Sequence, residues 1–242
     1  MRRLLVPPEL LAGDAITLSG APFHHLCRVL RMPVGAEVLV GDGHGLWLRC
    51  RIERVDKDCA RLAVCERECR SDAALEVHLL QGLPKGDKLE LVLQKATELG
   101  AARLTPVLTA RSVPVRDAAR EGRRLERWQR IVTEATRQCG RAQVPRVDAP
   151  LPLEQAFSQV DAEMRLVAWE EGGRNLGSLA ENSPPSSVAV LIGPEGGFEA
   201  SEVTLAQEFG FLPVTLGPRI LRTETAGMVL AAWLQLIWGD MG

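Results

Sequence analysis

The chain has 242 residues, of which 46% are hydrophobic and 25% are charged. This composition is typical of a globular protein of one or two domains and argues against a disordered chain. The sequence contains no run of 18 apolar residues, and its start, MRRLLVPPEL, reaches two prolines before an apolar segment can form. We therefore expect no membrane-spanning helix and no signal peptide, and we expect a cytoplasmic protein.

The net charge of −2 hides an uneven distribution along the chain. Residues 103–146 carry 11 arginines against 4 acidic residues, whereas residues 147–242 carry 4 basic residues against 13 acidic ones. Because the planar guanidinium group suits phosphate oxygens, the basic block is a candidate phosphate-binding surface. A genome that favours arginine codons, combined with an ordinary solvated helix, is the competing interpretation.

The cysteines and histidines do not form a pattern of metal ligands. Cys65 and Cys69 are spaced C-x-x-x-C, but no second pair accompanies them, and the H-E-x-x-H motif is absent. We therefore expect reduced, mostly buried thiols and no metal site.

In chain order, the first 70 residues indicate strands with one short helix. The helix is expected at 22–31, where Phe23, Leu26 and Leu30 share one stripe. Short apolar runs between turn residues predict strands at 37–40, 47–55 and 59–65. This pattern suits a small β-barrel, and a plausible boundary at 71–74 divides the chain into domains 1–72 and 73–242.

From residue 75 onwards, strands alternate with helices, which indicates an α/β domain with a largely parallel sheet. The expected strands are 77–80, 104–108, 165–169, 188–192 and 214–216. The expected helices are 88–99, 120–138, 200–209 and 224–238. In the helix at 120–138, arginines form one stripe, and the opposing face carries Leu125, Trp128, Ile131 and Val132.

Two loops that directly follow expected strands are candidates for a binding site, since α/β sheets bind ligands at the carboxyl ends of their strands. IGPEGGF at 192–198 is rich in glycine, which lets a backbone approach a ligand closely. LGPRILRTETA at 216–226 places charged side chains among apolar ones and opens a helix with Thr223 or Thr225 as its cap. Neither segment matches a nucleotide-binding fingerprint, and ordinary tight turns with a capping box are the alternative interpretation.

These two segments resemble the signature of the RsmE family, methyltransferases of small-subunit ribosomal RNA within the SPOUT superfamily. The resemblance covers nearly the whole chain, with one departure at Cys139, where the family usually has serine. The other matching segments are His25–Leu26, Arg28–Arg31, Lys85, Lys88, Gln94–Gly100, Pro106, Arg111–Val113, Glu134–Ala135 and Gln138–Arg141. The resemblance implies an α/β fold in which a PUA-like RNA-binding β-barrel precedes a SPOUT domain with a trefoil knot.

The resemblance also implies a homodimer that uses S-adenosylmethionine to form N3-methyluridine in 16S rRNA of the assembled small subunit. A SPOUT enzyme with another target atom and a non-catalytic RNA-binding assembly factor are the alternatives. The cofactor-binding residues that it implies lie in three segments: Trp169 and Glu170; Ile192, Gly193, Pro194, Glu195, Gly196 and Gly197; and Leu216, Gly217, Arg219, Ile220, Leu221, Thr223 and Ala226.

Methyl transfer from a sulfonium needs no metal, but the target nitrogen of uracil carries a proton. The reaction therefore needs a base or a group that stabilises the anionic ring. Our hypothesis is that Arg222 stabilises charge on the uracil oxygens, while Glu224 orients Arg222 or accepts the proton. A structural ion pair between the two residues is the alternative.

The expected RNA-binding residues are arginines: Arg28, Arg31, Arg111, Arg120, Arg123, Arg124, Arg127 and Arg141. Only 4% of residues are aromatic and none is tyrosine, which argues against a platform on which bases stack. The apolar segment 228–238 is either core or a subunit interface, and the dimer of the family favours the interface.

Overall fold

The computed structural model describes residues 1–72, 75–112, 118–181 and 183–242, and in 118–121 it describes the backbone but not the side chains. Contacts within the chain divide it into two compact units. The first unit contains residues 1–72 and 136–144, and the second contains 73–135 and 145–242. The chain therefore leaves the first unit after residue 72, returns to it for residues 136–144, and ends in the second unit.

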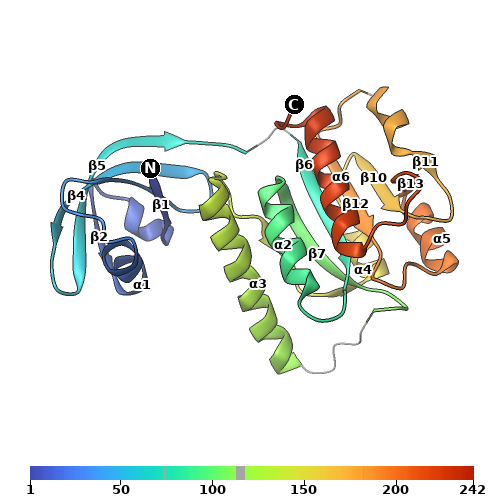
Figure 1. The fold of residues 1–242 in the computed structure, drawn as a ribbon, viewed down its shortest axis with the longest axis horizontal. Helices are drawn as coiled ribbons and strands as arrows, with labels where there is room; N and C mark the ends of the chain where they lie inside the picture. The colour runs from blue at the N-terminus through green and yellow to red at the C-terminus, as the bar shows by residue number, and fades with distance from the viewer. Residues whose placement is uncertain (73–74, 113–117, 182) are drawn as a thin grey trace. The chain divides into compact units, whose positions relative to one another are not determined.

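The first unit is built on a five-stranded sheet with the order β1-β3-β4-β5-β2. The strands of this sheet are drawn in blue to cyan in Figure 1. β1 runs parallel to β3, and all other pairs are antiparallel. The core lies on one face of this sheet, where alternating residues such as Val38, Val40, Leu48, Cys50 and Ile52 are fully buried. The strands are β1 (Arg2–Leu5), β2 (Ala15–Ser19), β3 (Glu37–Gly41), β4 (Leu46–Val55) and β5 (Cys59–Cys69), and the short helices are η1 (Pro8–Leu11), α1 (Gly20–Phe23) and η2 (His24–Val29).

The three strands expected in this unit are confirmed, and two more are present that the sequence analysis did not predict. β5 continues four residues beyond the expected end because Cys69 pairs with Leu46 at the start of β4. β1 and β2 have four and five residues, and β2 alternates between buried and exposed positions, a signal that the sequence analysis missed. The helix expected at 22–31 is divided into α1 and the wider π-helical turns of η2, and the chain leaves it at Arg31 with a φ of 50°.

Residues 136–144 pack with the first unit, although we expected them in the second domain. Two backbone contacts attach the segment to the turn after β3: Val144 N–H donates to the carbonyl of Gly43 at 2.8 Å, and Gln143 forms a bridge with His44. Arg141 Nη2 lies 2.8 Å from Asp72 Oδ2, and the backbone N–H of Ala142 donates to Asp72 Oδ1 at 2.7 Å. These distant contacts, which local sequence patterns do not report, assign the segment to the first unit.

The second unit is built on a parallel sheet with the order β11-β13-β10-β12-β6-β7-β8, in which β9 also pairs with β7. Its central strands β6 and β12 are buried over most of their length and nearly continuously apolar, as is typical of a sheet covered on both faces. The strands are β6 (Glu76–Gly82), β7 (Ala101–Leu108), β8 (Arg146–Val147), β9 (Leu151–Pro152), β10 (Met164–Ala168), β11 (Arg174–Asn175), β12 (Ser187–Ile192) and β13 (Leu212–Thr215).

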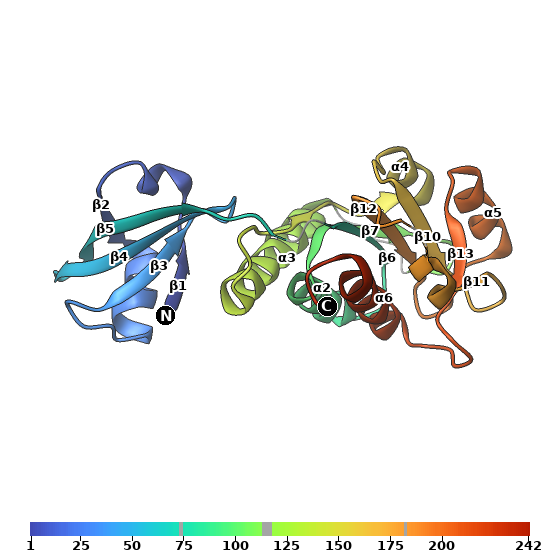
Figure 2. The ribbon, with the colours of Figure 1, turned by 90° about the horizontal axis from the view of Figure 1, so that it is seen from above.

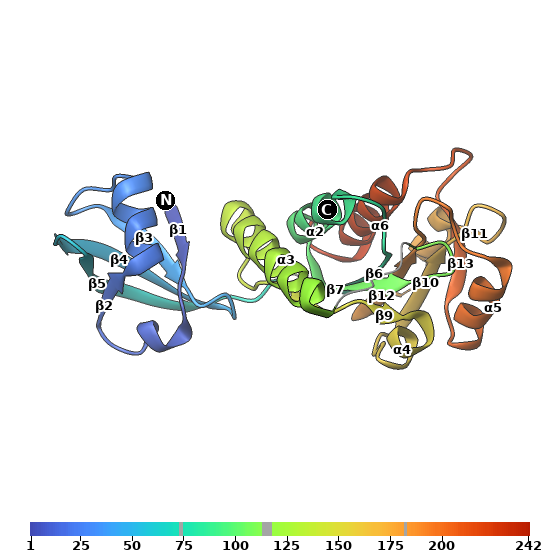
Figure 3. The same cartoon turned by 90° about the horizontal axis from the view of Figure 1, so that it is seen from below.

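Helices cover both faces of this sheet. α2 (Lys88–Glu98) and α6 (Thr223–Trp238) pack together on one face, and α4 (Leu153–Ser158) and α5 (Ala200–Glu208) cover the other (Figure 2 and Figure 3). α3 (Ala118–Cys139) is tied to α2 by an ion pair of 2.7 Å between Arg127 and Glu90, and η3 (Leu176–Glu181) follows β11. None of the helices in the described ranges has both the length and the apolar composition that a membrane crossing requires.

The predicted parallel α/β domain is confirmed, with each expected strand and helix present within a few residues. α2 ends as expected at Gly100, whose φ of 85° favours glycine. The two-residue strands β8, β9 and β11 and the six-residue helix α4 were not predicted, because such short elements show no periodicity. The trefoil knot stays a prediction of the resemblance.

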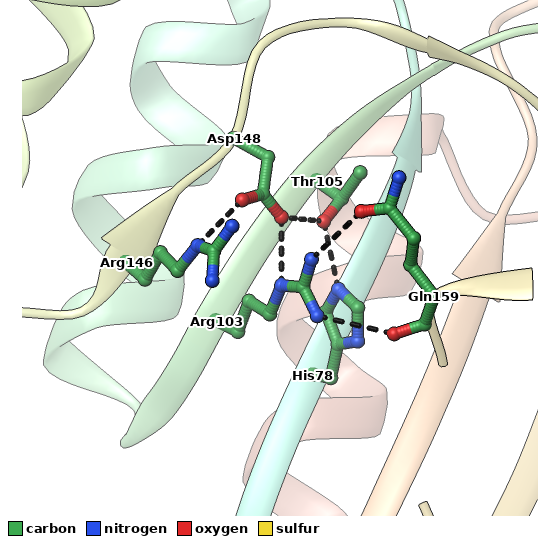
Figure 4. Close-up of polar contacts among 6 residues, drawn as sticks. All are labelled: His78, Arg103, Thr105, Arg146, Asp148 and Gln159. Carbon is green, nitrogen blue, oxygen red and sulfur yellow. Dashed lines mark hydrogen bonds and ion pairs between the residues drawn. The ribbon is translucent and has the colours of Figure 1, made fainter. Parts of the chain in front are cut away.

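A buried polar network lies where β6 and β7 begin (Figure 4). Asp148 accepts hydrogen bonds from Thr105 Oγ1 at 2.6 Å and from Arg103 Nε at 2.7 Å, and Arg146 Nε donates to its other oxygen at 2.7 Å. Because Thr105 uses its only proton on Asp148, its oxygen must accept the proton of His78 Nε2, which lies 2.8 Å away. Nε2 of His78 therefore carries a proton.

Burial and the positive charges of Arg103 and Arg146 together lower the pKa of His78 to about 4, against the opposing effect of Asp148. Since the pKa in the folded state lies below that of an unfolded histidine, the unfolded chain binds more protons as the pH falls. We expect His78 to reduce the free energy of unfolding progressively between about pH 6.5 and pH 4, by about 3 kcal/mol in total.

Titration of the imidazole resonances by NMR, with a His78→Gln variant for assignment, measures this directly. The ring of His78 should stay neutral down to about pH 4, and the pH dependence of stability in this window should be weaker in His78→Gln. A His78 pKa near 6.5 in the folded protein would contradict the network as described.

Candidate functional site

A cavity of about 400 Å³ lies at the carboxyl ends of three neighbouring strands of the second unit, β13, β10 and β12. Its size is in the range of pockets that hold small organic ligands. The loops after these three strands form its walls. Since the three strands are parallel neighbours, loops that are far apart in sequence meet at this edge.

The loop after β12 contains the glycine-rich segment. Gly197 has a φ of 69°, and its N–H donates to the carbonyl of Pro194 at 3.0 Å, so that the backbone turns sharply. Arg111 supports the loop from outside: its Nη1 donates to the carbonyl of Gly196 at 2.6 Å, and a Cβ on Gly196 would lie only 3.1 Å from Arg111 Cβ. The loop leads into α5, where Glu202 accepts the N–H of Glu199 at 2.9 Å.

The loop after β13 contains the second segment and leads into α6. Gly217, with a φ of 101°, turns the backbone, and Ile220 is 81% exposed at the mouth of the cavity. α6 begins at Thr223, but the expected threonine cap is wrong. Arg222 occupies the cap position with no side-chain hydrogen bond, and the Thr223 hydroxyl is used elsewhere: it donates to the carbonyl of Gly193 and accepts from Gln81 Nε2.

The loop after β10 completes the wall. Trp169 N–H donates to the carbonyl of Val214 at 3.0 Å, which extends the pairing of β10 with β13 by one residue. Glu170 reaches towards the glycine-rich loop, since a Cβ on Gly197 would lie 2.9 Å from Glu170 Oε1. This third loop, which came only from the resemblance, therefore lies against the other two.

The structure gathers nearly all of the expected cofactor and catalytic residues around this cavity. Gly196 is the exception, because it faces Arg111 and not the cavity. The lining residues that we expected are Trp169, Glu170, Ile192, Gly193, Pro194, Glu195, Gly197, Leu216, Gly217, Arg219, Ile220, Leu221, Arg222, Thr223, Glu224 and Ala226. Those that the sequence analysis missed are Lys88, Ala168, Phe198, Val214, Thr215 and Pro218. Phe198 and Pro218 lie inside the two candidate loops, and Ala168, Val214 and Thr215 come just before the expected segments. Lys88 comes from α2 and had been noted only as a residue that matches the family.

Lys88 belongs to the site through Glu195. Its Nζ lies 2.7 Å from Glu195 Oε1, and the backbone N–H of Lys85 donates to the same carboxylate at 3.2 Å. Burial by itself raises the pKa of Glu195, but these hydrogen bonds outweigh it and hold the pKa below its usual value. Glu195 is therefore ionised and ties the start of α2 to the glycine-rich loop.

Arg222 and Glu224 are not paired with each other. Both side chains line the cavity, and within the described residues no ion pair between them is recorded. The roles of the two residues stay predictions. Arg222 is exposed, whereas Glu224 Oε2 is buried and, among the residues that are described, has no hydrogen-bond partner. A buried polar atom without a partner is costly, so Glu224 is available to a donor that enters the cavity.

The expected RNA-binding arginines are found in different settings. Arg28 and Arg31 are exposed in the first unit, at η2 and just after it. Arg123, Arg124 and Arg127 are exposed on α3, opposite the buried Trp128 and Val132, as the helical stripe predicted. Arg120 lies in α3 at a position whose side chain is outside the described residues.

Two of these arginines make contacts that suggest another role. The Arg141 side chain is only 11% exposed and pairs with Asp72, and Arg111 binds the carbonyl of Gly196. Both guanidinium groups therefore hold the protein together, which argues against Arg141 as a direct contact to a phosphate. The sequence offered no signal for either partner.

In the parts of the chain that the structure describes, no cluster of three or more histidine, cysteine or acidic side chains is arranged to hold a metal ion. The cavity instead offers apolar walls, glycine backbone and one unpartnered carboxylate oxygen. This combination suits an organic ligand that carries both apolar surface and a cationic or hydrogen-bond-donating group. S-adenosylmethionine has these properties, so the residues present fit it.

Known proteins resemble this chain over its full length. The family model described as RNA methyltransferase domain matches residues 71–235, and the model described as RNA methyltransferase PUA domain matches residues 18–65. The ribosomal RNA small subunit methyltransferase E of Bacillus subtilis is 35% identical over 98% of this chain and 97% of its own length. The protein of the same name from Synechocystis is 36% identical over 97% of this chain and 77% of its own length.

A solved structure agrees with these relatives. The ribosomal RNA small subunit methyltransferase E from Neisseria gonorrhoeae, in a crystal structure bound to S-adenosyl methionine, superposes with a TM-score of 0.90. It is 32% identical, and the match covers 100% of both chains. Together with the two family models, these similarities over the whole length show that the chain belongs to the ribosomal RNA small subunit methyltransferase E family.

Proposed function

We propose that this protein methylates 16S rRNA of the small ribosomal subunit, with S-adenosylmethionine as the methyl donor and N3 of a uridine as the target. The observation that supports it best is the cavity at the carboxyl ends of β13, β10 and β12, since all three segments that resemble the family's cofactor loops meet there. The first unit then acts as the PUA-like RNA-binding domain and the second as the SPOUT domain, both in the cytoplasm.

The residues that would hold the cofactor are those of the three loops. Leu216, Ile220 and Ala226 offer apolar surface for the adenosine, and the backbone at Gly193 and Gly197 offers hydrogen-bonding groups that side chains do not obstruct. Glu224 Oε2, buried and without a partner in the described chain, is positioned to accept a hydrogen bond from a donor in the cavity.

When bound, S-adenosylmethionine supplies an electrophilic methyl group on a sulfonium. The protein must then handle the proton on N3 of uracil and the negative charge that its loss leaves on the ring oxygens. Arg222, exposed at the rim of the cavity, is placed to stabilise that charge. Glu224, on the first turn of α6, is the candidate acceptor of the proton.

We propose that each unit contributes exposed arginines that contact RNA phosphates, one group on α3 and the other in the first unit. Arg123, Arg124 and Arg127 share one face of α3, and Arg28 and Arg31 lie around η2. Such groups neutralise phosphates without reading sequence, so the target uridine must be selected by the shape of the RNA and by the site itself.

We further propose a homodimer formed through α6. This helix is apolar nearly all round, and it exposes Val229, Leu236 and Ile237 although its opposite side is buried against α2 and the sheet. Exposed apolar side chains in this number on one helix are typical of an interface.

A deletion strain tests the function most directly. We expect nucleoside mass spectrometry of its 16S rRNA to show the loss of one N3-methyluridine, and the wild-type gene to restore it. Loss of a different methylated nucleoside would assign another target atom, and an unchanged profile would contradict the enzymatic function.

Replacing Arg222 tests its role in the reaction. Because Arg222→Ala removes the charge that stabilises the ring oxygens, we expect turnover on small subunits to fall by about a hundredfold to a thousandfold. Calorimetry should show that S-adenosylmethionine still binds. Arg174→Ala, which removes an exposed arginine of β11, is the control and should keep its turnover. Near-normal turnover of Arg222→Ala would contradict the role.

Charge reversal on α3 tests the RNA surface. The variant that combines Arg123→Glu with Arg127→Glu loses two phosphate contacts, so its binding to small subunits should weaken. The slope of log K against log salt concentration should decrease by about two, because about two fewer counterions are released. Loss of the exposed pair between Arg127 and Glu90 should have little effect on stability. Affinity for S-adenosylmethionine should be unchanged. Unchanged subunit binding would contradict the assignment.

A further inference from the structure

Gln81 is a buried polar residue to which neither the sequence analysis nor the proposed mechanism gives a role. It lies near the carboxyl end of β6, paired in register with Ile192 of β12, and is only 2% exposed. Its Nε2 donates to Thr223 Oγ1 at 2.8 Å and to the carbonyl of Gly82 at 3.1 Å. Gly193 and Thr223 line the cavity, whereas Gln81 lies behind them.

We propose that Gln81 is a positioning residue that acts through Thr223 to set the separation of the two glycine-containing loops, and thereby the affinity for S-adenosylmethionine. This inference rests on the proposed function of the cavity.

The direction of the hydrogen bonds supports this role. An amide nitrogen only donates, so the oxygen of Thr223 must accept from Gln81. The single proton of the Thr223 hydroxyl is then directed to the carbonyl of Gly193, where the second contact is found. One side-chain amide on β6 therefore fixes a bond between the start of α6 and the glycine-rich loop.

The packing around Gln81 leaves little room for these elements to move. A Cβ on Gly82 would lie 2.6 Å from Pro194 N and 2.8 Å from Gly193 C, so the end of β6 touches the backbone of the loop. A Cβ on Gly227 would lie 3.4 Å from Gln81 Oε1, so α6 approaches from the other side. Because close-packed interiors have few voids and transmit strain, a shift of Gln81 would also displace the two loops.

The remaining oxygen of Gln81 indicates that the residue is not there for stability alone. Oε1 is buried and, within the described residues, has no hydrogen-bond partner, which is unfavourable for folding. An apolar residue of similar size would avoid that cost. An apolar residue at position 81 would lack the Nε2 donor of Gln81. Within the described residues, the only contact that this donor makes outside β6 is with Thr223.

A double-mutant cycle tests the inference with the full-length protein. The variants are Gln81→Leu, Thr223→Val and their combination, and calorimetry measures the Kd for S-adenosylmethionine. We expect each single variant to raise the Kd roughly tenfold, as for the loss of one hydrogen bond, and the double variant to raise it by about the same factor. With small subunits as substrate, the KM for S-adenosylmethionine should rise while kcat changes little. Thr223→Ser, which keeps the hydroxyl, should bind nearly as the wild type does.

Gln235→Leu is the matched control. Gln235 is also a fully buried glutamine of the second unit, and its Oε1 has no hydrogen-bond partner among the described residues. Its Nε2, however, donates to the carbonyl of Gly100, and neither residue lines the cavity. Its substitution should change the melting temperature and leave the Kd unchanged. A Gln81→Leu variant that also keeps the wild-type Kd, or single effects that simply multiply in the double variant, would overturn the inference. Failure of the wild type to bind S-adenosylmethionine would instead overturn the proposed function and everything that rests on it.

If Gln81→Leu does not fold, Gln81→Glu provides an independent test. The neutral acid can donate to Thr223 as the amide does, whereas the carboxylate can only accept. The affinity of this variant for S-adenosylmethionine should therefore fall as the pH rises through the titration of Glu at position 81, over about pH 5 to 9 for a buried carboxyl. If Gln81→Glu binds S-adenosylmethionine as tightly as the wild type does at every pH, the role of the donor is contradicted.

Discussion

The parallel order of β13, β10 and β12 is the constraint on which the rest of the second unit depends. Three neighbouring strands that run in the same direction end at the same edge, so the loops that follow them must meet there. Trp169, Gly193 and Leu216 are separated by more than 20 residues from one another, yet they line one cavity. The site therefore depends on the order of the strands and not on any individual residue.

The polar side chains are treated differently at the two edges of this sheet. At the edge where β6 and β7 begin, Thr105, Arg103 and Arg146 all donate hydrogen bonds to Asp148, and Thr105 also contacts His78. At the opposite edge, hydrogen bonds from Thr223, Arg111 and Lys88 hold the loops in place, while Glu224 Oε2 is buried without a partner in the described chain. A rigid frame with an unsatisfied group inside it is the arrangement expected of a binding site.

The arginines show why a count of charges was only a partial guide. The sequence places 11 of them in residues 103–146. In the folded protein, several of these arginines make intramolecular contacts: Arg103 binds Asp148, Arg141 binds Asp72, and Arg111 binds the backbone at Gly196. Others, such as Arg124, are exposed on α3. The basic block was real, but which of its members face a polyanion depends on acidic and backbone partners up to 85 residues away.

The sequence by itself determined the parallel α/β domain, the main strands and helices, and the segments that form the cavity. Periodic burial and glycine turns are local, so runs such as VAVLI followed by GPEGGF carry them directly. The tertiary structure alone decided that Thr223 joins two loops and does not cap α6, and that Gln81 Nε2 donates to Thr223 Oγ1 at 2.8 Å. It also decided that residues 136–144 belong to the first unit. Gln81 and Thr223 are 142 residues apart. A hydrogen bond of this kind exists only after the chain has brought both partners together, and no local pattern records it.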